Sequence, residues 1–265
     1  EKHLVTKELE AKNADLIQLN RLKDEFLACI THELKTPLTA VLGLSNLLKG
    51  QALGKLNDRQ IRYANLIHES GRHLMTVVND ILDLTRMETG QMELTPQPVK
   101  IREVCDRAYQ ETIELRTKGN GNKKDEKLAE KIQFTLEIEP ELKMLVADEL
   151  RLRQMLVNLI SNALKFTGIG GKIGLIVSRW ERWIAFKVWD TGIGIPAEKQ
   201  HLIFQKFQQL ESPLTRQFEG TGLGLAICKA LVKIMGGALR LESEEGKGSK
   251  FIFTVKFEHA DTDLK

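Results

Sequence analysis

Residues 148–166 read DELRLRQMLVNLISNALKF, a stretch that predicts one helix with two different faces. Its apolar residues recur at steps of three and four, which is typical of a helix face packed into a core. These residues are Leu152, Met155, Leu156, Leu159 and Ala163. Asn158, Asn162 and Lys165 follow one another at i, i+4 and i+7, so they form a single stripe along the helix.

This polar stripe has two interpretations. One is a plain solvent-exposed face, but such faces usually carry Glu and Lys, and asparagine inside a helix costs helix propensity. The other is a binding function, because amide oxygens can bind Mg²⁺ and a lysine can reach a phosphate. We favour the second interpretation for Asn158, Asn162 and Lys165.

On both sides of this helix the sequence alternates between helical and strand patterns. Further helices are predicted over residues 99–115 and 222–235. Strands are predicted over residues 132–138, 172–178, 183–189, 238–243 and 250–257. Strands with interleaved helices predict an α/β sandwich. Residues 116–131 are polar and include glycine, so we expect a solvated loop there.

The sequence before Thr89 contains no strand pattern and predicts an all-α helical hairpin. Residues 9–30 carry the alternating three- and four-residue steps of a coiled coil. The helical pattern continues to about Gly50, and Asn57 with Gln60 forms a predicted N-cap pair for a second helix. Each helix has an apolar stripe too wide for one partner, so we predict a four-helix bundle made by two chains.

Composition excludes several classes of protein. The 39 Lys and Arg against 36 Asp and Glu give a net charge of +3, which is too balanced for a nucleic-acid binder that relies on phosphate attraction. No apolar run is long enough to span a bilayer, and no signal-peptide pattern opens the chain. The three cysteines lie far apart, which favours a reducing compartment. We expect a cytoplasmic location, and Glu1 in the place of Met is compatible with a longer, membrane-anchored protein.

The segment 26–38, FLACITHELKTPL, contains a candidate nucleophile. A neutral imidazole is nucleophilic near pH 7, which makes His32 a candidate. Glu33 is the nearest candidate base, and Thr36 lies one turn further along on the same face as His32. A lone histidine on a helix is more often structural or simply exposed, so this segment does not decide the function by itself.

Two glycine-rich segments are candidate parts of a nucleotide site. In DTGIGIP, residues 190–196, Asp190 can accept a hydrogen bond from an exocyclic amine, and the glycines let the backbone approach a flat ring. In GTGLGL, residues 220–225, glycines open a helix whose free N–H groups can bind phosphate. Leu225 stands where a dinucleotide-binding fingerprint has its third glycine, so that kind of site is excluded. Each segment alone also fits an ordinary turn before a helix.

Taken together and in this order, these segments resemble the transmitter core of bacterial sensor histidine kinases. FLACITHELKTPL resembles the H-box of that family, and DELRLRQMLVNLISNALKFT resembles its N-box. DTGIGIP, FQKF and GTGLGL resemble the G1, F and G2 boxes. The resemblance extends from about Lys23 to Phe257. It implies a dimerisation and phosphoacceptor hairpin followed by an ATPase domain of the gyrase and Hsp90 type.

The resemblance implies a role for each motif residue in phosphoryl transfer from ATP and Mg²⁺. His32 is implied as the phosphorylated residue, with Glu33 assisting proton removal and Thr36 supporting phosphatase activity. Asn162 is implied as the Mg²⁺ ligand. The residues implied to bind ATP are Asn158, Asn162, Lys165, Phe166, Asp190, Gly192, Gly194, Gly220, Thr221, Gly222, Leu223, Gly224 and Ser249.

The resemblance also implies how the chain is organised. We expect a signalling coiled-coil helix over residues 1–22 and a dimerisation and histidine-phosphotransfer hairpin over 23–90. A linker over 91–98, with Pro96 and Pro98, would lead to a catalytic ATP-binding domain over 99–258 and a tail over 259–265. The implied partners are a second copy of the chain, a response regulator and an upstream sensor domain on the full-length protein. No nucleic-acid partner is expected, because the charge of the chain is balanced.

Three other functions remain open at this point. The chain could act mainly as a phosphatase of its partner regulator, with ATP as a conformational ligand. A degenerate nucleotide-binding scaffold that only dimerises is the second alternative, but His32, Asn162, Lys165 and Asp190 are all present. The third is an ATPase without a phosphohistidine, which would leave the hairpin that bears His32 unexplained.

Overall fold

The computed structural model describes residues 12–13, 17–18, 22, 30, 33–52, 54–119, 132–209 and 221–256. The chain divides into two compact units, Glu1–Met92 and Glu93–Lys265. The coiled coil predicted over residues 9–30 lies almost wholly outside the described residues. Among the helices of the described residues, none combines the length and the apolar character needed to cross a membrane.

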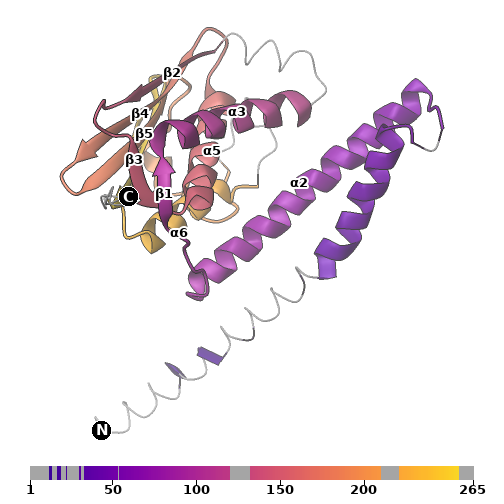
Figure 1. The fold of residues 1–265 in the computed structure, drawn as a ribbon, viewed down its shortest axis with the longest axis horizontal. Helices are drawn as coiled ribbons and strands as arrows, with labels where there is room; N and C mark the ends of the chain where they lie inside the picture. The colour runs from indigo at the N-terminus through magenta and orange to yellow at the C-terminus, as the bar shows by residue number, and fades with distance from the viewer. Residues whose placement is uncertain are drawn as a thin grey trace, which may run out of the picture. The chain divides into compact units, whose positions relative to one another are not determined.

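The first unit contains the predicted helical hairpin (Figure 1). One helix covers residues 33–49, and the second is α2 (Asp58–Glu88). The predicted capping pair is confirmed: the Gln60 N–H donates to the Asn57 side chain at 3.0 Å, and the Asn57 N–H donates to the Gln60 side chain at 2.9 Å. Two N–H groups that the helix cannot satisfy are paired in this way, which is why α2 begins here.

The two helices of the hairpin pack closely on one side. Leu38 of the first helix and Ala64 and Val78 of α2 are buried. A Cβ atom at Gly71 would lie only 3.0 Å from Leu42 Cδ2, so glycine permits this close approach of the helices. Large apolar side chains elsewhere on the hairpin stay exposed in the single chain. They are Leu34, Val41, Leu44, Leu47, Leu48, Tyr63, Leu66, Ile67 and Leu74.

The second unit is an α/β sandwich, as the sequence predicts (Figure 1). Its main sheet has the strand order β2-β4-β5-β7-β6. β2 pairs with β4 in parallel, and the other neighbouring strands are antiparallel. The strands are β2 (Gln133–Ile138), β4 (Lys172–Trp180), β5 (Trp183–Asp190), β6 (Leu239–Glu244) and β7 (Gly248–Lys256).

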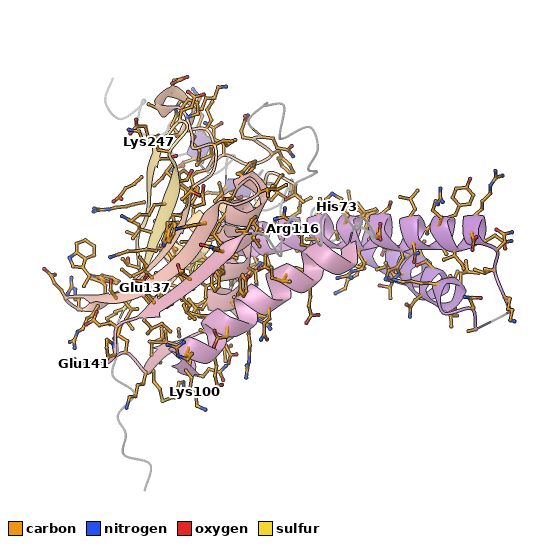
Figure 2. All side chains as sticks on the ribbon, turned by 90° about the horizontal axis from the view of Figure 1, so that it is seen from above. His73, Lys100, Arg116, Glu137, Glu141 and Lys247 are labelled. Atoms are coloured by element: carbon orange, nitrogen blue, oxygen red, sulfur yellow. The ribbon has the colours of Figure 1, made fainter. Side chains whose placement is uncertain are left out.

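Three helices, α3 (Ile101–Gly119), α5 (Glu149–Phe166) and α6 (Gly224–Ile234), cover one face of this sheet (Figure 1). All five apolar residues predicted to form the core face of α5 are buried. They pack over a sheet whose own core includes Phe186 stacked on Phe253, with ring centroids 4.9 Å apart. Arg116, near the C-terminal end of α3 (Figure 2), donates through Nη1 to the Leu164 carbonyl at 2.6 Å and so ties α3 to the last turn of α5.

The structure corrects two expectations about elements. Residues 97–100, expected to end the linker and begin a helix, form β1 (Gln97–Lys100), which pairs antiparallel with β3 (Met144–Ala147). Strands of four residues are too short for a clear alternation, and a two-stranded ribbon tolerates the missing N–H of Pro98. In addition, α3 continues to Gly119, so residues 116–119 are not loop. Residues 120–131 lie outside the described part of the chain.

Candidate functional site

β5 ends at Asp190, whose side chain is buried with 9% of the residue's surface exposed. Asp190 Oδ1 accepts a hydrogen bond from the Gly192 N–H at 2.8 Å, and the Ser249 N–H also donates to this carboxylate. Burial raises the pKa of Asp190, while the two N–H groups lower it in part because they favour the charged form. An ionised carboxylate has about four lone-pair directions, so it can still accept a hydrogen bond from a ligand amine.

The turn after Asp190 accepts only glycine at two positions. A Cβ atom at Gly192 would collide with the Phe166 carbonyl oxygen, and one at Gly194 would collide with a backbone carbonyl at the end of β6. Gly194 also has a φ of 67°, in the left-handed region that favours glycine. The Ile193 N–H donates to the Phe166 carbonyl at 3.3 Å. The turn is therefore held against the last residue of α5.

Two serine hydroxyls hold the other side of this turn. Ser243 and Ser249 lie opposite each other on β6 and β7, and their Oγ atoms are 3.0 Å apart. The Ile195 N–H donates to Ser243 Oγ, which also bonds to the Gly248 carbonyl, each at 2.9 Å. Ser243 is not among the site residues predicted from the sequence. The signal that could have found it is a hydroxyl at the end of a predicted strand, opposite Ser249 in a predicted hairpin.

The polar stripe of α5 lies beside the start of α6. Asn158 Nδ2 donates to the Gly224 carbonyl at 3.4 Å. Asn162, one turn further along, is half-buried. Burial lowers the pKa of Lys165, whose Nζ lies 5.2 Å from the centroid of the Phe166 ring. A partly desolvated ammonium interacts more strongly with a nearby anion than a fully hydrated one.

The start of α6 has the features of an anion-binding site. The N-cap residue of α6 makes no side-chain capping hydrogen bond, and the first N–H groups of the helix carry the positive end of its dipole. The Leu223 N–H donates to Thr221 Oγ1 at 3.1 Å, and buried Leu223 anchors the turn. Gly222 has a φ of 69°, and its carbonyl accepts the Phe207 N–H at 3.0 Å.

The structure thus brings the predicted nucleotide residues of the second unit around α5. The last residue of that helix, Phe166, contacts the turn after Asp190, and Asn158 in its middle contacts the start of α6. A buried carboxylate and an uncapped helix start are the two chemical features that an adenine amine and a phosphate chain require. Gly220 lies outside the described residues.

The predicted phosphoacceptor residues belong to the first unit. Glu33 and Thr36 are exposed at the start of the helix over residues 33–49. His32 itself lies outside the described residues. The two units supply different parts of the predicted chemistry, an acceptor in one and a nucleotide site in the other.

The donor set of the site suits a cation that is shared with phosphates. The described residues contain no group of three or more His, Cys, Asp or Glu side chains that could hold a metal ion. Mg²⁺ keeps several waters and commonly takes only one or two protein oxygens when phosphates supply the rest. Asn162 is half-buried and lies on α5 between Asn158 and Phe166, the residue that contacts the turn after Asp190. Its amide fits such a role.

Comparison with known protein families agrees with this division. Residues 22–90 match the family described as His Kinase A (phospho-acceptor) domain. Residues 147–259 match the family described as Histidine kinase-, DNA gyrase B-, and HSP90-like ATPase.

Individual relatives are similar over most of the chain. It is 43% identical over 233 residues to the circadian input-output histidine kinase CikA of Synechococcus elongatus, with 88% of this chain and 30% of that protein covered. It is 35% identical to histidine kinase 5 of Arabidopsis thaliana, with 90% of this chain and 27% of that protein covered. The crystal structure of full-length ShkA in complex with AMPPNP has a TM-score of 0.73 and 35% identity, covering 89% of this chain and 46% of that one.

The chain spans less than half the length of these three relatives. Within that span, both halves of the kinase core are present in the order that the motifs indicate. With a phosphoacceptor hairpin in its first unit and an ATP-binding α/β sandwich in its second, the chain belongs to the sensor histidine kinases.

Proposed function

We propose that the chain transfers the γ-phosphoryl group of ATP to His32 and then to an aspartate of a response regulator. An imidazole nitrogen of His32 attacks the γ-phosphorus, the bond to the ADP oxygen breaks, and ADP leaves with that electron pair. Glu33 accepts the imidazole proton. The observation that carries this proposal is the arrangement of Asp190, Asn158 and the start of α6 around α5, in a chain that also contains the phosphoacceptor match.

In the nucleotide site, the adenine amine would donate to Asp190 while the ring lies over the Gly192–Gly194 turn, close to Ser249. The phosphates would lie at the start of α6, which includes Thr221, Gly222, Leu223 and Gly224, and Gly220 would precede them. Lys165 and Asn158 would stabilise the phosphate charge, and Asn162 would hold Mg²⁺, which supplies charge neutralisation when bound. Phosphoryl transfer needs little covalent help from the protein, so positioning and charge stabilisation would do most of the catalysis.

The proposal includes the organisation expected from the sequence. A signalling helix over residues 1–22 would pass a conformational change to the hairpin over 23–90, and the ATP-binding domain over 99–258 would move on the linker over 91–98. The exposed apolar side chains of the hairpin support a dimer, because a second copy would cover them. The regulator would dock near the exposed start of the first helix, beside His32.

The test is incubation of the chain with γ-labelled MgATP, with His32→Gln as the matched variant. We expect label that is acid-labile and alkali-stable on the wild type only, and no label when Mg²⁺ is chelated. Label that survives in His32→Gln would place the acceptor elsewhere. A wild type that binds ATP and takes no label would contradict the kinase proposal and favour the phosphatase or scaffold alternative.

A phosphatase activity toward the same regulator is the second candidate. Thr36 is exposed one helical turn from His32, where a hydroxyl can position a water molecule. We expect Thr36→Ala to slow decay of the phosphorylated regulator at least about tenfold while leaving autophosphorylation within about twofold. Thr39→Ala, three residues further along the same helix at an exposed position, is the control, because it removes the same hydroxyl and methyl groups farther from His32. Unchanged decay in Thr36→Ala would remove this role from Thr36.

A further inference from the structure

The backbone between the two units is held at both ends by hydrogen bonds. On the side of the first unit, the Gln91 and Met92 N–H groups donate to the Arg86 carbonyl in the last turn of α2, at 2.9 and 3.1 Å. On the side of the second unit, the Thr95 N–H donates to Asp148 Oδ2 at 3.0 Å. Only Glu93 and Leu94 lie between these two anchors.

Asp148 makes its bond to the linker while it also begins α5. It is the N-cap of α5, and its Oδ1 accepts the Arg151 N–H at 3.1 Å. The residue is buried, with 8% of its surface exposed, and each of its carboxylate oxygens accepts a hydrogen bond from a backbone N–H. Hydrogen bonds from backbone N–H groups to a carboxylate are stronger than neutral ones.

The position of this bond follows from how β3 ends. β1 pairs with β3 with Gln97 opposite Ala147, and Asp148 follows directly as the chain turns into α5. Along β1 the N–H groups of alternate residues face β3, and the Ile101 N–H, which donates to the Lys143 carbonyl at 3.0 Å, shows that these are the odd-numbered residues. The Thr95 N–H therefore faces the same side, but the chain opposite it has already turned into α5, and the Asp148 side chain accepts this N–H.

The prolines stiffen the segment that Asp148 holds. A residue before proline is restricted to extended conformations, and this applies to both Thr95 and Gln97. With Thr95 bonded to Asp148 and Gln97 paired to β3, residues 95–100 move as part of the second unit. The backbone that can pivot is thereby reduced to Glu93 and Leu94.

We infer that Asp148 is a positioning residue for phosphoryl transfer: by holding the Thr95 N–H it limits the pivot to two residues and fixes the linker to α5, which carries the polar stripe. This inference rests on the proposed transfer from ATP to His32. A longer, looser tether lowers the effective concentration of one tethered site at another, and a misplaced reactant loses rate without losing affinity. Breaking the bond is therefore expected to act on transfer and not on ATP binding.

Asp148→Ser separates the two roles of this carboxylate. A serine retains an N-cap acceptor of comparable quality and lacks the second oxygen that holds Thr95. We expect the Thr95 amide to exchange with solvent more than about tenfold faster in Asp148→Ser, because its acceptor is gone. The affinity for a non-hydrolysable ATP analogue and the KM for ATP stay within about twofold, while kcat of autophosphorylation falls about three- to tenfold. Asn57→Ser, the same kind of N-cap change at α2 without a linker bond, leaves all four quantities unchanged.

A second variant removes the donor and leaves α5 intact: an ester in place of the Thr95 amide. It is expected to reproduce the fall in kcat, and combining it with Asp148→Ser should add nothing further. A Thr95 amide that exchanges as fast in the wild type as in Asp148→Ser would overturn the anchor, and an unchanged kcat in both variants would overturn its role in transfer. A wild type that takes no label contradicts the proposed function, and amide exchange alone then decides whether Asp148 anchors the linker.

Discussion

At the scale of single residues, the protonation state of Asp190 would decide whether the proposed site accepts adenine. Asp190 is buried at the end of β5, and its pKa is raised by that burial. An ionised carboxylate accepts a hydrogen bond from the exocyclic amine of adenine, whereas the oxygen at the same place in guanine would repel it. In the proposed site, burial would make this discrimination strong, because an unpaired buried acceptor costs more free energy than an exposed one.

The pH dependence of nucleotide affinity follows from the direction of this shift. Because the pKa of Asp190 is raised, the carboxylate becomes protonated at a higher pH than an ordinary aspartate. We expect ATP affinity to be constant at neutral pH and to fall as the pH is lowered through the raised pKa, as measured by titration calorimetry. Asp190→Asn is expected to weaken ATP binding about 10- to 100-fold and to abolish this pH dependence. A wild-type affinity that is flat under acid conditions in which the protein stays folded would contradict the role of Asp190.

At the scale of elements, the candidate site depends on how closely the turn after β5 approaches α5. Gly192 leaves no room for a side chain, because the Phe166 carbonyl and Asp190 Oδ1 occupy the space, the latter at 2.7 Å from an added Cβ. The Ile193 N–H completes the contact by donating to the same Phe166 carbonyl. The end of β5, the turn and the end of α5 are therefore in direct contact, and a side chain added at Gly192 would separate them.

We expect Gly192→Ala to lower the free energy of unfolding by about 1–3 kcal/mol, because the new methyl group would push the turn away from α5. ATP affinity should fall with it, since Asp190 loses the Gly192 N–H in its present position. Gly168→Ala is the control: an added Cβ there meets nothing within 4 Å. Chemical denaturation and ATP titration of both variants measure the two effects. Equal stability of the two variants would show that the turn can shift without cost.

At the scale of the whole molecule, the hairpin leaves apolar surface that a single chain does not cover. Leu44 is 63% exposed although it lies on the same helix as buried Leu38 and Ser45. Exposed leucines on both helices of a hairpin are typical of a bundle completed by a second copy. The close contact of Gly71 with Leu42, by contrast, is internal to one chain.

We expect the wild type to be a dimer and Leu44→Lys to raise the dissociation constant of that dimer at least about tenfold, because a charge would be buried in an apolar interface. Asn46→Lys, two residues along and so about 200° around the helix, is the control with the same added charge. Sedimentation equilibrium measures the change. A monomeric wild type would remove the dimer from the proposal.

The elements and the kinase family could be predicted from local sequence, because the information that specifies them is local. The period of apolar residues gives the helix of residues 148–166, reciprocal caps give the start of α2 at Asn57, and the motif order gives the family. The short pairing of β1 with β3 escaped prediction, since four residues carry too little pattern and the pair Pro96 and Pro98 predicts a linker.

The contacts that join these elements come from chain segments far apart in sequence, and residue spacing carries no information about them. The strand order β2-β4-β5-β7-β6, the Phe166 carbonyl against the Gly192 turn, Ser243 opposite Ser249 and the Thr95 N–H on Asp148 all belong to this class. Local sequence was therefore enough to predict most of the helices and strands, apart from β1 and β3, and the family to which they belong. The backbone groups that meet at the candidate site and at the linker could not be predicted in this way, because their contacts form only when the sheet and the helices pack together.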